Sequence, residues 1–188
     1  AVAGGIPIIK TLREAMAGNS VSRISGILNG TCNYMLSRME LEGLTYDACL
    51  ADAQALGYAE ADPTFDVGGF DTAHKLALLA SLAFGTEIDA SSIYVEGIEA
   101  ITPLDLKMAD ELGYRIKLLG VAERDPQTGA VSVRVHPAMV HVQHPLAAVR
   151  EAFNAVTVEG EASGALMFYG RGAGGDPTAS SVLGDVID

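Results

Sequence analysis

The chain has 188 residues, 49% of them hydrophobic and 19% charged, which is enough apolar material for one sizeable core. Twelve lysines and arginines stand against twenty-four aspartates and glutamates, and the formal charge of −12 repels both a nucleic-acid backbone and an anionic membrane surface. We therefore predict one soluble domain, residues 1–188, that binds neither nucleic acid nor membrane.

The cysteines predict the cellular compartment of the protein, and the N-terminal residues predict that the chain is part of a longer one. Cys32 and Cys49 are the only cysteines, and both lie in apolar helical patterns without metal-ligand spacing. Buried, reduced thiols of this kind predict a cytoplasmic protein. Residues 1–7 carry neither an initiator methionine nor the pattern of a secretion signal, so we expect the chain to be a piece of a longer protein.

The first half of the chain predicts helices around one strand. Apolar residues at helical spacing predict a helix over 7–17, and small and β-branched residues predict a strand over 20–28. Residues 58–70 show neither period and predict a loop. Three further helices are expected: one capped by Thr31 and ending near Glu42, one capped by Thr45 and ending at Gly57, and one capped by Asp71 and ending near Phe84.

The second half predicts one more helix and then strands. Thr102 and Pro103 are a strong helix start, and Gly113 is the expected end. Alternation on both sides of the 125–129 turn predicts a hairpin over 114–124 and 130–140. Further strands are expected over 156–161 and 165–169, with a last helix starting at residue 176 or 177.

This order of elements predicts the fold class. Helices come first and antiparallel strands later, without regular βαβ alternation, which indicates an α+β domain. We expect a mixed, largely antiparallel sheet with helices covering one face. The other face then needs cover, and a self-complementary dimer would supply it.

Asp71 and Lys75 are the first candidates for chemistry. They lie four residues apart in a helical segment that is apolar almost all round, so they share one face of it. On a surface such a pair adds only ~0.3–0.5 kcal/mol. A charged pair in a mostly buried helix is expensive to retain, which indicates a functional site in which Lys75 can act as general acid and base.

Glu60, Asp62 and Asp66 add three carboxylates in the loop before that helix. Their spacing does not match the D-x-[DN]-x-[DN]-G calcium loop, and the segment contains a lysine. Carboxylates beside a lysine suit a substrate with an amino group, because an acid can hold the ammonium while a proton moves elsewhere. An amino-acid ligand is therefore expected.

Two irregular segments have open interpretations. The glycine-rich residues 170–178 lead into a helix, and backbone amides there can approach a cofactor closely. Because the chain shows no Rossmann-type unit, a dinucleotide would need a further domain. Residues 2–7 either turn carbonyls toward a hard cation or form a plain entry into the first helix.

Four stretches of the sequence resemble homoserine dehydrogenases, the NAD(P)-dependent enzymes that interconvert homoserine and aspartate semialdehyde. They occur in the family's order and span essentially the whole chain. The stretches are V-A-G-G-I-P-I at 2–8, I-L-N-G-T-C-N-Y at 27–34, the signature over 53–75 that includes G-Y-A-E-A-D-P, and G-A-G-G-D-P-T-A at 172–179.

The resemblance implies a role for individual residues. It implies that Lys75 gives and takes the proton at the substrate oxygen, acting as acid on the aldehyde and as base on the alcohol. The other implied roles are homoserine binding for Glu60, Asp66, Asp71 and Thr31, cofactor binding for Gly57 and Gly174, and a monovalent-cation site (Na⁺ or K⁺) for the backbone carbonyls of Val2, Gly4 and Ile6.

The resemblance also implies an arrangement. The chain corresponds to the family's substrate and dimerisation domain, with 1–7 entering from, and 176–188 returning toward, a dinucleotide-binding domain that the chain lacks. A glutamate ligand of the cation, a second active-site lysine and the NAD(P) fold would lie upstream, so the free domain is expected to be inactive. The implied setting is threonine and methionine biosynthesis in a cytoplasmic homodimer. The alternative is a non-catalytic dimerisation or amino-acid-binding module.

Overall fold

A six-stranded sheet is the frame of the molecule. The computed structural model describes residues 2–187. The strands run in the order β2-β4-β3-β1-β5-β6, and every neighbouring pair is antiparallel except β2 and β4. The mixed, largely antiparallel sheet of an α+β domain is thereby confirmed. The strands are β1 Val21–Ile27, β2 Tyr94–Val95, β3 Tyr114–Arg124, β4 Val131–His141, β5 Phe153–Gly160 and β6 Gly164–Arg171.

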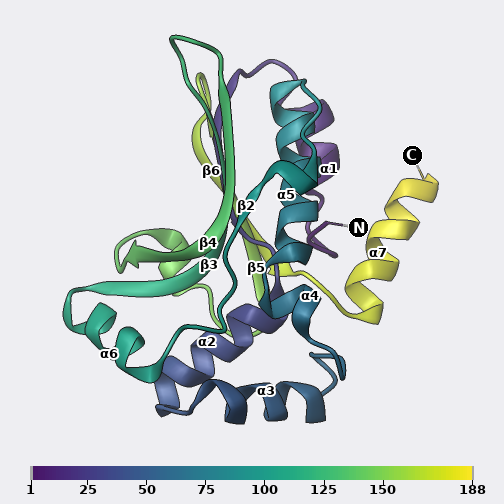
Figure 1. The fold of residues 1–188 in the computed structure, drawn as a ribbon. Helices are drawn as coiled ribbons and strands as arrows, with labels where there is room; N and C mark the ends of the chain where they lie inside the picture. Colours follow the sequence, from purple (N-terminus) through teal and green to yellow (C-terminus); the bar gives the residue numbers. More distant parts are fainter. Residues whose placement is uncertain (1, 188) are drawn as a thin grey trace.

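The helices pack around the outside of this sheet. Figure 1 shows α5 along one face of the twisted sheet, α2 and α3 below it, and α7 standing apart on the side of α5. In the described part of the chain no helix has the length and apolar character to span a membrane. The α-helices are α1 Ile8–Lys10, α2 Gly30–Glu42, α3 Tyr46–Ala55, α4 Thr64–Val67, α5 Phe70–Phe84, α6 Pro103–Glu111 and α7 Gly175–Ile187. Three further helical segments are the π-helical η1 Thr11–Ala15 and the 3₁₀ segments η2 Ala90–Ser92 and η3 Pro145–Ala148.

The main core lies between α5 and the sheet. Leu76 and Leu79 of α5 are fully buried, and a Cβ built on Gly120 of β3 would lie 3.2 Å from the Leu76 side chain. A glycine at this position therefore lets the helix approach the strand closely. Burying a leucine of this kind stabilises the fold by roughly 1.5–3 kcal/mol.

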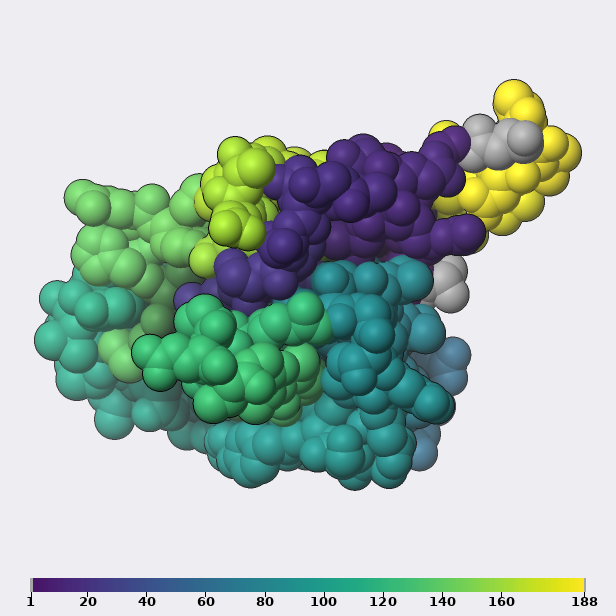
Figure 2. Space-filling model, turned by 90° about the horizontal axis from the view of Figure 1, so that it is seen from above, coloured from purple at the N-terminus to yellow at the C-terminus, as the bar shows by residue number. Residues whose placement is uncertain are grey.

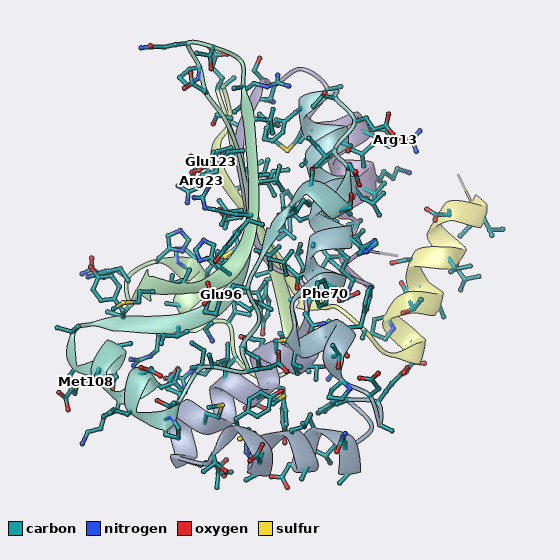
Figure 3. All side chains as sticks on the ribbon, viewed as in Figure 1. Arg13, Arg23, Phe70, Glu96, Met108 and Glu123 are labelled. Carbon is teal, nitrogen blue, oxygen red and sulfur yellow. The ribbon has the colours of Figure 1, made fainter. Side chains whose placement is uncertain are left out.

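The opposite face of the sheet is only partly covered. A smaller apolar cluster that includes Ile27 and Val121 packs under η3. Beyond this cluster, Figure 3 shows Arg23 and Glu123 together on the side of the sheet away from α5, where they form an ion pair of 3.3 Å. Tyr169 of β6, which pairs with Ala155 of this cluster, remains about half exposed. That a second copy covers this face stays a prediction.

Several helix starts differ from the sequence prediction. Asn29, not Thr31, caps α2: its Oδ1 accepts the Cys32 N–H at 2.9 Å, whereas Thr31 lies inside the helix. Asp71 does not cap α5, because the helix begins at Phe70, after Gly69 with φ +86°. Only a residue without a side chain adopts this backbone conformation readily. The expected helix over 7–17 is the short α1 followed by a π-helical turn.

Other predictions agree more closely with the structure. Thr45 and Thr102 cap their helices as predicted, and the β3–β4 hairpin is confirmed in register over its whole length. The predicted loop 58–70 contains the four-residue helix α4, which is too short to show a period. The two-residue strand β2 gave no signal for the same reason.

Lys117 of β3 is a buried cation that the sequence did not reveal. Its residue is 1% exposed, and its Nζ donates to the Val149 carbonyl at 2.6 Å and to Asn33 Oδ1 at 3.2 Å. Burial lowers its pKa from 10.5 to about 8, the Glu40 carboxylate opposes this shift, and Arg150 and Arg115 add to it.

Replacing Lys117 by methionine tests this burial. Because the pKa is lower in the folded state, the unfolded chain alone holds the proton between pH 8 and 10.5, and stability rises with pH across that window. The rise is at most ~3 kcal/mol, at 1.36 kcal/mol per pKa unit. The free energy of unfolding of Lys117→Met, measured with urea, should not show this rise with pH. The exposed Lys107→Met variant should keep the rise. If the unfolding free energy changes with pH equally in wild type and in Lys117→Met, the lowered pKa of Lys117 is contradicted.

Candidate active site

Lys75 and Asp71 form the centre of the site on α5. Lys75 Nζ lies 2.7 Å from Asp71 Oδ2, and both side chains are 21% exposed. Lys75 also donates to the backbone carbonyl of Leu28 at 3.1 Å. The predicted pair therefore exists, partly buried yet open to solvent, and its ammonium is held from two directions.

Asn29 links this pair to a second carboxylate. Its Nδ2 donates to Asp66 Oδ1 at 2.8 Å and to Asp71 Oδ2 at 2.9 Å, while its Oδ1 caps α2. Asn29 itself is 5% exposed. One buried amide thus holds two carboxylates that would otherwise repel each other, and it fixes them relative to the helix that follows β1.

Burial and charge act on Asp66 in opposite directions. Burial raises its pKa, the hydrogen bond from Asn29 lowers it, and the charge of Asp71 raises it again. The net effect is a raised pKa. The charge of Glu60 also raises it.

Cys32 lies behind these carboxylates. Its Sγ donates to the Asp66 carbonyl at 3.2 Å, and burial together with Asp66 and Asp71 raises its pKa well above the ordinary value. A neutral, buried thiol is a poor nucleophile. The site therefore offers lysine and carboxylate chemistry rather than thiolate chemistry.

The segment between α3 and α4 carries the predicted substrate residue Glu60 and the predicted cofactor contact Gly57. Thr31 Oγ1 donates to the carbonyl of Tyr58 at 2.7 Å, which ties that segment to the start of α2. Glu60 is exposed, and Gln54 Nε2 holds its carbonyl at 3.0 Å. Gly57 is exposed and has φ +75°, and apart from its own atoms and its chain neighbours no atom of the described residues lies within 4 Å of the position that a Cβ would take.

The glycine-rich loop joins β6 to α7. Gly170, Gly172 and Gly175 have the literal G-x-G-x-x-G spacing between a strand and a helix. However, β6 pairs antiparallel with β5, so the loop does not belong to a parallel βαβ unit and the spacing alone does not make a Rossmann site. Gly174 has φ +118°, a conformation that only glycine adopts without strain.

The N-terminal carbonyls are already partly used. Gly4 O accepts a hydrogen bond from Ser181 Oγ at 2.7 Å, and Ile6 O accepts the Ile8 N–H at 2.7 Å. Each oxygen keeps a second lone pair. In residues 2–187 no group of three or more His, Cys, Asp and Glu side chains is placed to hold a metal ion.

Sequence reasoning missed three groups that the structure brings to the site. Asn29 precedes an expected helix start, where asparagine is a favoured N-cap residue, so its capping role could have been predicted from the sequence. The Leu28 carbonyl and Asn154 left none. Asn154 is 1% exposed on β5, and its Nδ2 donates to the Leu28 carbonyl at 3.0 Å.

The fold and the site define a class of protein. An α+β domain with a half-open lysine–carboxylate cluster beside two exposed glycine turns has the composition of an enzyme's substrate domain. The sequence profile of the family described as homoserine dehydrogenase matches residues 7–187. The chain belongs to the homoserine dehydrogenase family.

Named relatives and solved structures agree with this assignment. The homoserine dehydrogenases of Mycobacterium bovis and Corynebacterium glutamicum are 57% and 51% identical to it over 190 residues, which is all of this chain and 43% of each relative. The chain thus spans less than half the length of these relatives.

The structural comparison covers the whole fold. The crystal structure of a homoserine dehydrogenase from Thiobacillus denitrificans has a TM-score of 0.96 and 50% identity, over 100% of this chain and 43% of that one. A hyperthermophilic archaeal homoserine dehydrogenase in complex with NADPH has a TM-score of 0.82 and 29% identity, over 99% and 52%.

Replacing Asn29 by aspartate tests its role as a bridge. Aspartate keeps the cap of α2 but exchanges the two donated hydrogen bonds for a third carboxylate. We expect a loss of about 1–3 kcal/mol at pH 7 and a smaller loss near pH 4, because the crowded carboxylates take up protons more readily in the folded state. Chemical unfolding of wild type and Asn29→Asp at both pH values measures this difference in unfolding free energy.

Asn19→Asp is the matched control for Asn29→Asp. Asn19 Oδ1 accepts the Ser163 N–H at 3.0 Å, a bond that aspartate also makes, and Asn19 touches none of the site carboxylates. This variant should lose little stability at either pH. A pH-independent loss in Asn29→Asp would contradict the bridging role.

Proposed function

We propose that the protein from which this domain derives interconverts L-homoserine and L-aspartate 4-semialdehyde with NAD(P), in threonine and methionine biosynthesis in the cytoplasm. The observation that carries the proposal is Lys75, held by Asp71 and the Leu28 carbonyl within the carboxylate cluster of a chain that belongs to this family. The NADPH complex of the archaeal relative supports the cofactor class.

The residues of this chain bind the substrate and move one proton. Glu60, Asp66 and Asp71 supply negative charge for the substrate's ammonium, with Thr31 beside them. Lys75 gives a proton to the aldehyde oxygen in one direction and takes it from the alcohol in the other. Asp71 and Leu28 hold its ammonium in place, so the proton is delivered from a fixed point.

Gly57 and Gly174 are the proposed cofactor contacts. Both are exposed and have positive φ angles, and the space where a Cβ of Gly57 would lie is open. Backbone without side chains suits the close approach of a flat ring. A bound nicotinamide supplies or accepts the hydride. The main dinucleotide-binding domain is proposed to be a separate part of the protein, reached through residues 1–7 and 176–188.

The position of the two chain ends supports this arrangement. Figure 2 shows α7 projecting from the body of the molecule beside the N-terminal segment, and the bond between Ser181 and Gly4 joins the two. No residue of α7 is buried, although Val186 and Ile187 are apolar. We propose that the dinucleotide-binding domain covers this helix.

Two further proposals concern the assembly and its ions. The half-covered sheet face with Tyr169 is proposed as the homodimer interface. The carbonyls of Val2, Gly4 and Ile6 are proposed as part of a Na⁺ or K⁺ site that needs ligands from elsewhere in the protein, since two of the three already accept hydrogen bonds.

Steady-state oxidation of L-homoserine by the full-length protein tests the proposed reaction. Lys75→Ala should lower kcat/KM by about 10²–10⁴-fold, the range of a lost general acid–base group, while the melting temperature stays nearly constant. Lys75→Arg should be similarly impaired, because arginine keeps the charge but does not release its proton.

The exposed Lys107→Ala variant is the matched control and should keep full turnover. Full turnover in Lys75→Ala would remove the assignment of the proton carrier. A wild-type protein without activity on either cofactor, with Na⁺ or K⁺ present, would favour a non-catalytic dimerisation or amino-acid-binding module instead.

A further inference from the structure

The carbonyl of Leu28 is shared by two donors from different parts of the fold. Lys75 Nζ of α5 reaches it at 3.1 Å, and Asn154 Nδ2 of β5 reaches it at 3.0 Å. Leu28 is fully buried and follows β1 directly. A carbonyl oxygen has two lone pairs, so these two bonds use its full capacity and leave Lys75 one direction of approach.

Asn154 is itself held in place by the glycine-rich loop. A Cβ built on Gly172 would lie 2.1 Å from both Cγ and Nδ2 of Asn154, so the loop backbone packs directly on the amide. Gly172 also packs against Gly4: a Cβ built on Gly4 would lie 2.4 Å from the Gly172 carbonyl oxygen. The loop backbone therefore limits how far the amide can turn away from Leu28.

The amide is retained although it is incompletely satisfied. Asn154 is 1% exposed, and its buried Oδ1 has no hydrogen-bond partner among residues 2–187. A buried acceptor without a partner costs about 1–3 kcal/mol. The stability of the strand does not account for an asparagine here, since its inward-facing neighbours Val156 and Val158 are apolar.

We propose that Asn154 is a positioning residue for Lys75. It fixes the Leu28 carbonyl that orients the lysine ammonium, and through Gly172 it relates the lysine to the loop that carries Gly174. It does not touch the substrate. This inference rests on the proposed function, because it assigns Asn154 a part in the proton transfer made by Lys75.

The test is a double-mutant cycle in the full-length protein, with homoserine oxidation as the reaction. Asn154→Ala should lower kcat by about 10–100-fold, the loss expected when a reacting group is displaced by about 1 Å, with the KM values of both substrates nearly unchanged. In a Lys75→Ala background the same substitution should lower kcat no further, because the group it positions is absent.

Asn33→Ala is the matched control. Asn33 is equally buried at 2% exposure and bonds the carbonyls of Glu151 and Phe153 and the ammonium of Lys117, but it does not contact Lys75 or Leu28. It should lose stability and keep kcat when assayed well below its melting temperature. If Asn154→Ala does not fold, Asn154→Ser replaces it, since the shorter hydroxyl cannot span to Leu28.

The outcomes separate the two proposals. Full turnover in Lys75→Ala overturns the proposed proton carrier and the positioning role with it. Loss of turnover in Lys75→Ala with an unchanged kcat in the Asn154 variant overturns the positioning role alone. A further loss in the double variant, equal to that of Asn154→Ala in the wild-type background, also overturns it, since Asn154 would then act independently of Lys75.

Discussion

The site depends on how β1 becomes α2. β1 is an inner strand held on both sides by β3 and β5, and only Leu28 and Asn29 separate it from the helix. Within these two residues the chain presents one carbonyl to Lys75 and one amide to two carboxylates. The turn needs a glycine next, because a Cβ on Gly30 would lie 2.9 Å from the Ala152 carbonyl oxygen.

The charges of the cluster balance one another through this turn. Asp71 and Lys75 neutralise each other on α5, whereas Asp66 comes from α4 and has the Asn29 amide as its closest polar partner. Burial disfavours the charge of Asp66 and the amide favours it. The amide is a neutral donor, so it stabilises a second carboxylate without adding a second cation. The site thereby keeps a net negative charge, as the proposed binding of a substrate ammonium requires.

The sequence predicted what is periodic and local, and it missed what tertiary contacts decide. The hairpin and the Thr45 and Thr102 caps follow from residues close in sequence, and they are present as predicted. The pairing of Asp71 with Lys75 follows from helical spacing. Asn154 and Lys117 gave no signal, because a polar residue between apolar neighbours of a strand looks the same in the sequence whether it is exposed or buried, and the partners of both come from distant elements.

The Asn154–Leu28 hydrogen bond has a consequence for how the protein folds. It joins residues 126 positions apart, and β1 pairs with β5 over a similar separation. The chain loses the entropy of closing so long a loop before the contacts that the loop brings together can stabilise the fold. Folds rich in such long-range pairings therefore form slowly. During synthesis the lysine and its carboxylates leave the ribosome long before β5, so the site acquires its final geometry only when the domain is almost complete.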